Sequence, residues 1–597
     1  MQQLSENLFC FNDTCNVYVL RRGINAVLID FGAGDVLDEL PQIGVEQVTD
    51  VLMTHHHRDQ AQGLRRAVDL AARIWVPGAE QELFTEVEDH WRTRPLRNNY
   101  NVREDRFTIT ESVPVTGTLA EYRTTWYGGQ PFTVVPLPGH TVGSVGFLTR
   151  IDGRRVAFTG DLLAGPGKLW SLAATQWSYA GAEGLAATTL SLLDLRDRRP
   201  DVLLPSHGDV MTDANGAIDL LVGRLMRLLE VRGEHLDVIE RRDRPYVRVL
   251  PHLLCNRTAH AMSYVILSNS GKALIVDYGY DQYYGIAAGT DRASRRPWMY
   301  TVPVLRKFFD VTRIDVVIPT HYHDDHVAGF NLLREVEGAE VWASEDIADI
   351  LRNPWHYDLP CLWFEPIGVD RELPLNEPLR WEEHELTLHP LPGHTLHAVA
   401  IEATIDGTKV LFTGDQHTER ERPNYVYKNR FRIEDYRTAG ELYLRLRPDL
   451  LLTGHWGAVR TDDGLLQRLH DRGAELADLH RALLPLDSVD FGAEGFGAWI
   501  RPYQASVPER ARLRLEVEVR NPLPHPEQVT ATVVAPPDWH VESAQSSIRL
   551  GPGEHARLPF TVVPPPGTAG RRFVVAADLQ VGTRRFGQHA EALITVT

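Results

Sequence analysis

The hexamer PLPGHT occurs twice in this chain, at residues 136–141 and again at residues 390–395. The tetramer FTGD follows each copy, at residues 158–161 and at residues 412–415. The offset between the two hexamers equals the offset between the two tetramers, so the internal spacing of the repeat is preserved. A repeat with preserved spacing predicts two tandem copies of one folding unit.

Short apolar runs surround both copies in the same order. INAVLIDFG (24–32) corresponds to KALIVDYG (272–279), VTDVLMTHHH (48–57) to IDVVIPTHYH (314–323), and DVLLPSHG (201–208) to DLLLTGHWG (449–457). Each run ends in polar or glycine residues, which is typical of a buried strand that delivers a loop at its carboxyl end. Helical patterns lie between or after these runs, at 63–74, 182–196, 216–242, 440–447 and 464–484. Strands interleaved with helices predict an α/β layered fold.

The length of 597 residues predicts three or four domains, because one hydrophobic core does not organise so long a chain. We place the first repeat unit at residues 1–245 and the second at residues 246–488. Residues 489–597 contain short alternating runs such as RLRLEVEVRN and VTATVVAP, punctuated by Pro and Gly. This pattern predicts an all-β sandwich, which resembles the immunoglobulin-like modules appended to bacterial enzymes.

Composition indicates a soluble protein. The net charge of −18 argues against a nucleic-acid partner, because a polyphosphate needs a positive surface. We find no secretory signal at the N-terminus and no apolar stretch near the roughly 18 to 20 residues that cross a bilayer, so we expect a cytoplasmic protein without membrane contact. Four cysteines in a chain of this length do not form a disulfide framework, and we interpret Cys10 and Cys15 as free thiols.

The loop THYHDDH (320–326) follows a predicted strand of the second half and carries four side chains that can bind metal. Three more such side chains lie in PLPGHT, FTGD and TGHWG, each at the end of an apolar run. Imidazole and carboxylate are the ligands of zinc and related divalent metals. The seven candidates are His321, His323, Asp325, His326, His394, Asp415 and His455.

In these residues the chain resembles the metallo-β-lactamase superfamily, whose signature is H-x-H-x-D-H followed by three distant ligands. The resemblance covers roughly residues 10–240 and 250–480 and implies an αβ/βα sandwich with metals at one edge. It implies one metal at His321, His323 and His394, a second at Asp325, His326 and His455, and Asp415 as the bridge between them. Zinc is the expected metal, with iron or manganese as alternatives. Asp325 would then orient the attacking hydroxide and move a proton toward the leaving group.

The first half carries a similar but altered set. The resemblance implies six ligands there, with Asp59 in the role of Asp325: His55, His57, Asp59, His140, Asp161 and His207. Gln60 stands where the family has its fourth histidine, and an amide oxygen is a weak zinc ligand. Three interpretations stay open: two metals with activity, a single metal, or a degenerate partner that supports the second half.

Hydrolysis of a small ester, thioester, lactone or amide is the main functional interpretation. A phosphodiesterase of the same superfamily and a metal-stabilised binding or assembly protein without turnover are the alternatives. The segment NYVYKNRFR (424–432) mixes aromatic and cationic side chains, so it is either a binding loop for an anionic small molecule or a solvated basic loop. Its candidate residues are Tyr425, Tyr427, Lys428 and Arg430. A homo-oligomer, or a protein partner docked on the C-terminal sandwich, stays open.

Overall fold

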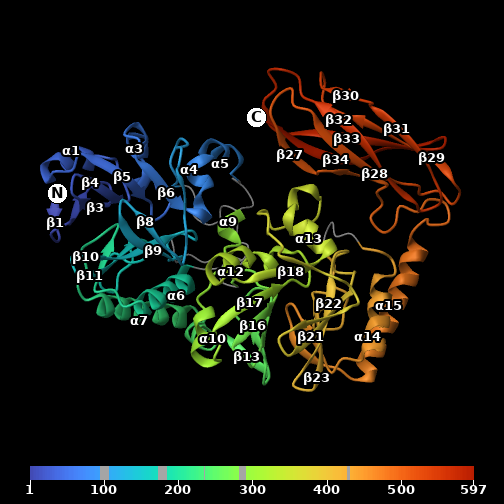
Figure 1. The fold of residues 1–597 in the computed structure, drawn as a ribbon, viewed down its shortest axis with the longest axis horizontal. Helices are drawn as coiled ribbons and strands as arrows, with labels where there is room; N and C mark the ends of the chain where they lie inside the picture. The colour runs from blue at the N-terminus through green and yellow to red at the C-terminus, as the bar shows by residue number, and fades with distance from the viewer. Residues whose placement is uncertain (95–106, 173–183, 234, 282–290, 427–430) are drawn as a thin grey trace. The chain divides into compact units, whose positions relative to one another are not determined.

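The computed structural model describes residues 1–94, 107–172, 184–233, 235–281, 291–426 and 431–597 (Figure 1). These residues form two compact units. The first unit contains residues 1–247, 256–260 and 279–311, and the second contains residues 248–255, 261–278 and 312–597. Residues 279–311, which follow the first strands of the second repeat, therefore belong to the first unit.

Two sheets carry the first repeat. The first has the order β1-β2-β3-β4-β5-β6-β7, with parallel pairing from β4 to β7. Its strands are β1 (Gln2–Gln3), β2 (Leu8–Asn12), β3 (Asn16–Arg22), β4 (Asn25–Ile29), β5 (Gln47–Leu52), β6 (Arg73–Pro77) and β7 (Gly117–Leu119). The second has the order β12-β11-β10-β9-β8. Its strands are β8 (Thr124–Tyr127), β9 (Gln130–Pro136), β10 (Val145–Ile151), β11 (Arg154–Gly160) and β12 (Val202–Pro205).

Helices cover the outer faces of these two sheets. One core joins the inner faces, and two further cores lie between each sheet and its helices, so the layers run helix, sheet, sheet, helix. This is the expected αβ/βα sandwich. The helices are α1 (Val36–Glu39), α2 (Arg58–Ala61), α3 (Leu64–Asp69), α4 (Glu82–Thr85), α5 (Val87–Thr93), α6 (Gly184–Asp197), α7 (Ala214–Arg232) and α8 (Val238–Asp243). Short 3-10 turns follow at η1 (Leu40–Ile43) and η2 (Gly78–Glu80).

The second repeat builds the same two kinds of sheet, in the orders β13 to β19 and β20 to β25. The first contains β13 (Tyr246–Leu250), β14 (Leu253–Asn256), β15 (Ser263–Leu267), β16 (Lys272–Val276), β17 (Arg313–Ile318), β18 (Glu340–Ser344) and β19 (Arg371–Leu373). The second contains β20 (Pro378–Trp381), β21 (His384–Pro390), β22 (Val399–Ile405), β23 (Thr408–Gly414), β24 (Leu450–Thr453) and β25 (Gly457–Arg460).

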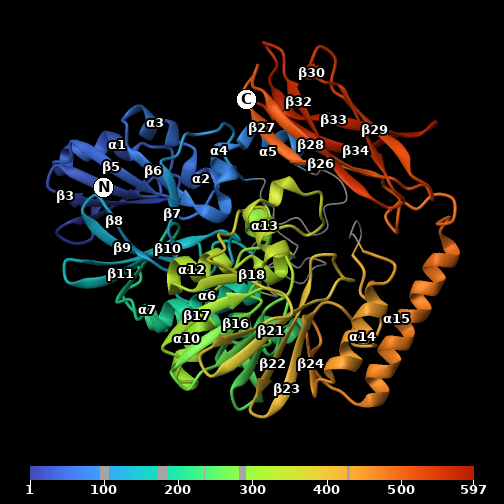
Figure 2. The same cartoon turned by 45° about the vertical axis from the view of Figure 1, so that its right-hand side comes forward.

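The helices of the second repeat follow its strands along the chain. α14 and α15 pack against each other and share a core with the sheet that contains β22, β23 and β24 (Figure 2). The helices are α9 (Asp291–Ser294), α10 (Val302–Phe308), α11 (Asp324–Val327), α12 (Phe330–Glu337), α13 (Glu345–Arg352), α14 (Asp435–Leu446) and α15 (Asp463–Leu483), with a 3-10 turn η4 (Pro354–His356).

The C-terminal residues form two antiparallel-rich sheets around one core, in the orders β26-β28-β32-β30 and β27-β34-β33-β29-β31. The predicted sandwich is therefore present, while its immunoglobulin-like class stays a prediction. Its strands are β26 (Ala498–Arg501), β27 (Gln504–Val507), β28 (Leu513–Arg520), β29 (Glu527–Val534), β30 (His540–Glu542), β31 (Gln545–Leu550), β32 (His555–Val563), β33 (Gly570–Val581) and β34 (Arg584–Val596).

Two predicted helices are shorter in the structure. The pattern at 63–74 forms a helix only to Asp69, because Ala71 adopts a positive φ of 54° and the chain turns into β6. The pattern at 216–242 is divided at Gly233, whose left-handed conformation ends α7 before α8 begins. Cys10 and Cys15 are free thiols, as predicted. Within the described ranges no helix has the length and apolar character needed to cross a membrane.

Candidate metal centres

Three histidines of the second unit converge on one point. His321 and His323 follow the carboxyl end of β17, and His394 lies in the loop after β21. Their ligand atoms all lie within 4.8 Å of one another, and His323 Nδ1 is 3.1 Å from His394 Nε2. All three side chains are buried. We refer to His321, His323 and His394 as the second-half triad.

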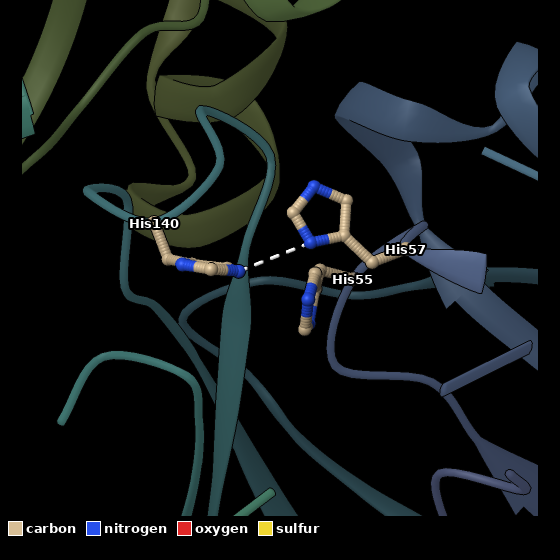
Figure 3. A group of neighbouring side chains, drawn as sticks. All are labelled: His55, His57 and His140. Carbon is tan, nitrogen blue, oxygen red and sulfur yellow. Dashed lines mark hydrogen bonds between the residues drawn. The ribbon is translucent and has the colours of Figure 1, made fainter. Parts of the chain in front are cut away.

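The first half contains the matching group, which we call the first-half triad: His55, His57 and His140. His57 Nδ1 lies 3.0 Å from His140 Nε2, and Figure 3 shows these imidazoles turned toward one another beside His55. Burial lowers the pKa of all three histidines, so they are neutral at physiological pH. A neutral imidazole has the free lone pair that a metal ligand requires.

A second group of donors lies beside the second-half triad. We refer to it as the second-half quartet: Asp325, His326, Asp415 and His455. His455 Nε2 is 3.0 Å from Asp415 Oδ2 and 3.3 Å from Asp325 Oδ2. Asp415 Oδ2 is also 3.5 Å from His394 Nε2, so this carboxylate lies between the quartet and the triad.

The two groups differ in electrostatics. Burial lowers the pKa of His323 to about 3, and like-charged histidine neighbours act in the same direction. In the quartet, burial opposes the charge of His455, but Asp415 and Asp325 prevail and raise its pKa to about 10. Without a bound cation the quartet therefore holds positive charge as protons on histidine. Two close buried carboxylates require such compensation, and a divalent cation can supply it in place of those protons.

The first half does not repeat the quartet geometry. The Gln60 amide nitrogen donates to Asp161 Oδ2 over 2.9 Å, so the side chain in place of the fourth histidine occupies one oxygen of that carboxylate. His207 presents Nδ1 to Asp161 at 2.9 Å, whereas its counterpart His455 presents Nε2. The ring of Trp170 stacks on His207 with centroids 4.1 Å apart.

Asp59 also differs from its counterpart Asp325. Its side chain is 43% exposed and Oδ2 lies 3.3 Å from His207 Nε2, whereas the side chain of Asp325 is 13% exposed. Among the described residues of the first half, the triad is the one group of three or more donors that meets within 4.8 Å. Asp59, Asp161 and His207 lie nearby without forming a second such group.

Two buried aspartates support the ligand loops and were missed by sequence reasoning. Asp277 accepts from His326 Nδ1 at 2.9 Å and from the Thr320 backbone at 2.7 Å, next to His321. Its counterpart Asp30 keeps the threonine contact, through Thr54, but accepts from Ser206 where Asp277 accepts from a histidine, and burial raises the pKa of Asp30 to about 7. The signal was present in the repeat, because an Asp follows the corresponding strand in both halves. Such outer hydrogen bonds fix the orientation of a ligating histidine.

The loops that carry the two triads are held differently in each half. In the first half Glu80, 2% exposed, accepts from the His56 backbone at 2.9 Å and from the Gly143 backbone at 3.1 Å. In the second half Gln416 accepts from the His394 backbone at 3.1 Å and donates to the Pro392 carbonyl. Neither residue has a counterpart of the same type in the other half, so the repeat gave no signal for them.

Of the four predicted substrate residues, the structure describes Tyr425. Tyr425 is 41% exposed and its ring packs against Phe431 and Tyr436. Tyr427, Lys428 and Arg430 lie outside the described residues. The carbonyl of Asn424, at the start of this segment, accepts from His394 Nδ1 at 2.9 Å, so the segment begins beside the second-half triad.

Comparison with known proteins agrees with this geometry. The sequence profile of the metallo-beta-lactamase superfamily matches residues 11–207 and again residues 258–455. This chain therefore belongs to the metallo-beta-lactamase superfamily and carries the family unit twice.

Individual relatives match shorter stretches. A stretch of 148 residues is 31% identical to a hydroxyacylglutathione hydrolase of Pseudomonas syringae pv. syringae (strain B728a), covering 24% of this chain and 46% of that protein. A stretch of 224 residues is 26% identical to a beta-lactamase-like protein 2 homolog of Drosophila melanogaster, covering 35% of this chain and 63% of that protein. A metallo-β-lactamase structure from Cronobacter sakazakii aligns with 40% of this chain and 95% of its own, at 18% identity and a TM-score of 0.31. The chain thus spans less than two thirds of either sequence relative.

Proposed function

We propose that this protein is a metal-dependent hydrolase and that its second half, within residues 246–488, cleaves a small ester, thioester, lactone or amide. The arrangement that carries the proposal is the second-half triad beside the second-half quartet, with Asp415 between them at 3.5 Å from His394. Seven imidazole and carboxylate donors without cysteine are typical of a catalytic rather than a structural metal site.

The donors fit a pair of divalent metals, zinc by expectation. His321 Nε2 is buried and has no hydrogen-bond partner among the described residues, as a ligand atom aimed at a cation would. We assign one metal to the second-half triad and the other to Asp325, His326 and His455, with Asp415 shared. For the first half we propose one metal at the first-half triad, because Gln60 occupies the carboxylate that would complete a second.

The chemistry follows from where the protein places its own groups. Metals bound at these donors would act as Lewis acids and lower the pKa of water from 15.7 to near 7. Burial opposes the ionised form of Asp325, but His326 and His455 lower its pKa, so the carboxylate is ionised at neutral pH. We assign Asp325 to accept a proton from the attacking water and to move it toward the leaving group. Asp277 keeps His326 oriented through its 2.9 Å hydrogen bond.

Acyl thioesters are the first substrates to test, because a relative over 148 residues is named for hydrolysing hydroxyacylglutathione. The assay uses the full-length, zinc-loaded protein with a hydroxyacylglutathione, a lactone, a β-lactam and a phosphodiester, beside Asp325→Asn and Asp59→Asn. We expect turnover of at least one acyl substrate and a loss of about 100- to 10,000-fold in Asp325→Asn, the range of general acid–base catalysis. Asp59→Asn is the matched control and should keep most of the activity. Absence of acyl turnover with both metals bound, or turnover of the phosphodiester alone, would overturn the proposal.

Gln60→His is expected to raise the metal content of the first half, because imidazole replaces an amide that now donates to Asp161. Metal per chain should increase by about one when measured by elemental mass spectrometry after removal of loosely bound ions. The reciprocal variant His326→Gln should lose about one metal from the second half. Unchanged metal content in both variants would contradict the role assigned to this position.

A further inference from the structure

A cavity of about 460 Å³ lies in the second unit, and none of the proposed metal ligands lines it. One part of its wall comes from the second repeat, at residues 356–359, His397, Val426 and Phe431. The other part comes from the C-terminal sandwich, within residues 493–503 and 588–591. The sandwich therefore supplies one side of a cavity whose other side belongs to the second repeat.

Strand β26 shows why these side chains face the cavity. Ala498 and Ile500 are 1% and 4% exposed and belong to the sandwich core. Successive side chains of a strand point to opposite faces, so Trp499 and Arg501 lie on the face of the strand away from this core, and both residues line the cavity. The backbone of Tyr503 donates to the His356 carbonyl over 3.2 Å, and this bond joins the two walls.

One wall residue lies close to the second-half triad. His397 follows the ligand His394 by three positions in the same loop. The centroid of its ring lies 6.4 Å from that of Tyr322, which stands between His321 and His323 in the chain. It also lies 6.5 Å from the ring of Tyr357. A molecule in the cavity would therefore be held beside the loops that carry the triad.

The wall favours one kind of ligand. Five aromatic side chains line it: Tyr357, Phe431, Phe496, Trp499 and Tyr503. Three carboxylates also line it: Asp358, Glu494 and Glu591. The guanidinium of Arg501 already lies over the Tyr357 ring, 4.7 Å from its centroid. Flat aromatic faces attract flat apolar groups, while the carboxylates repel an anion.

We propose that this cavity binds the acyl part of the substrate of the second half, and that this acyl part is an aromatic group without negative charge. The assignment of this cavity to a substrate rests on the proposed hydrolase function, whereas the binding of an aromatic group does not. The C-terminal sandwich is then a specificity-determining part of the enzyme, with Trp499 as its central contact.

Binding is measured first, independently of turnover. Phenylacetamide, which is uncharged and has no thioester, is titrated into the full-length protein by saturation-transfer nuclear magnetic resonance, and the same spectra check that its amide bond stays intact. We expect binding that weakens about tenfold in Trp499→Ala, the loss expected when an aromatic contact surface is removed. Ala493→Leu, which fills the cavity without removing an aromatic ring, should weaken it as well. Trp126→Ala, at a 68% exposed tryptophan of the first unit, is the matched control and should bind as the parent does.

Kinetics then test the acyl preference. The parent should hydrolyse a phenylacetyl thioester with a higher kcat/KM than the succinyl thioester of the same thiol, and Trp499→Ala should remove that preference through KM. Equal binding of phenylacetamide by the parent and by both cavity variants, each with an unchanged melting temperature, would overturn the cavity proposal. A preference for the succinyl thioester would overturn the uncharged class. Intact phenylacetamide binding with no hydrolysis of any acyl substrate supports the cavity and refutes only the hydrolase function.

Discussion

Asp415→Ala is expected to abolish most of the activity of this protein. The carboxylate lies between the second-half triad and the second-half quartet, 3.5 Å from His394 and 3.0 Å from His455. In the proposed site it would hold both metals, so its removal would weaken the binding of both at once. Losing several kcal/mol of metal-derived stabilisation corresponds to at least about a thousandfold in kcat/KM. The measurement is kcat/KM on the best acyl substrate together with metal content per chain.

Asp161→Ala is the matched variant in the first half. Asp161 lies 3.5 Å from His140, as Asp415 does from His394, but the same carboxylate oxygen also accepts from Gln60, so we expect a small change in total activity. Thermal unfolding of both variants separates loss of metal from loss of fold. If Asp415→Ala keeps its metals and its turnover while Asp161→Ala loses them, the catalytic half has been assigned wrongly.

Arg296→Ala is expected to destabilise the first unit by about 3–5 kcal/mol, the usual effect of removing one partner of a buried ion pair. The Arg296 side chain is 5% exposed, and its guanidinium pairs with Glu121 at 2.6 Å. It also donates to the carbonyls of Val142 and Ser144, in the loop that carries the candidate ligand His140. Chemical denaturation measures the stability, and hydrogen exchange of residues 139–145 reports the loop itself.

Arg292→Ala is the control for that experiment. Arg292 also forms an ion pair within the first unit, with Glu82 at 2.6 Å, but both side chains are 31% exposed. Exposed or half-exposed pairs contribute at most about 1 kcal/mol. A similar loss of stability in the two variants, or unchanged exchange at 139–145 in Arg296→Ala, would show that burial of the pair does not hold this loop.

The fold and the donor positions were largely accessible from sequence. The repeated PLPGHT and FTGD motifs predicted two copies of one α/β unit, and both are present. The loop THYHDDH and three distant side chains predicted seven donors, which the structure brings together as the triad and the quartet. These positions could be predicted because strand ends are local signals: an apolar run followed by His, Asp or Gly can be recognised without knowing its neighbours.

Other features depend on contacts between distant segments, and a repeat does not encode them. Glu80 and Gln416 support corresponding loops from unrelated positions, so comparing the halves could not find them. Helix lengths at 63–74 and 216–242 were decided by left-handed residues at Ala71 and Gly233.

By itself, the sequence determined that there are two family units and where their candidate ligands stand, because periodic apolar runs and spaced motifs are properties of the chain. Only the tertiary structure decided three further points. Residues 279–311 join the first unit, Gln60 bonds to Asp161, and the sandwich lines a cavity beside His397. The physical reason is that burial and hydrogen bonding are satisfied by whichever partners packing brings close, and those partners lie far apart in the sequence.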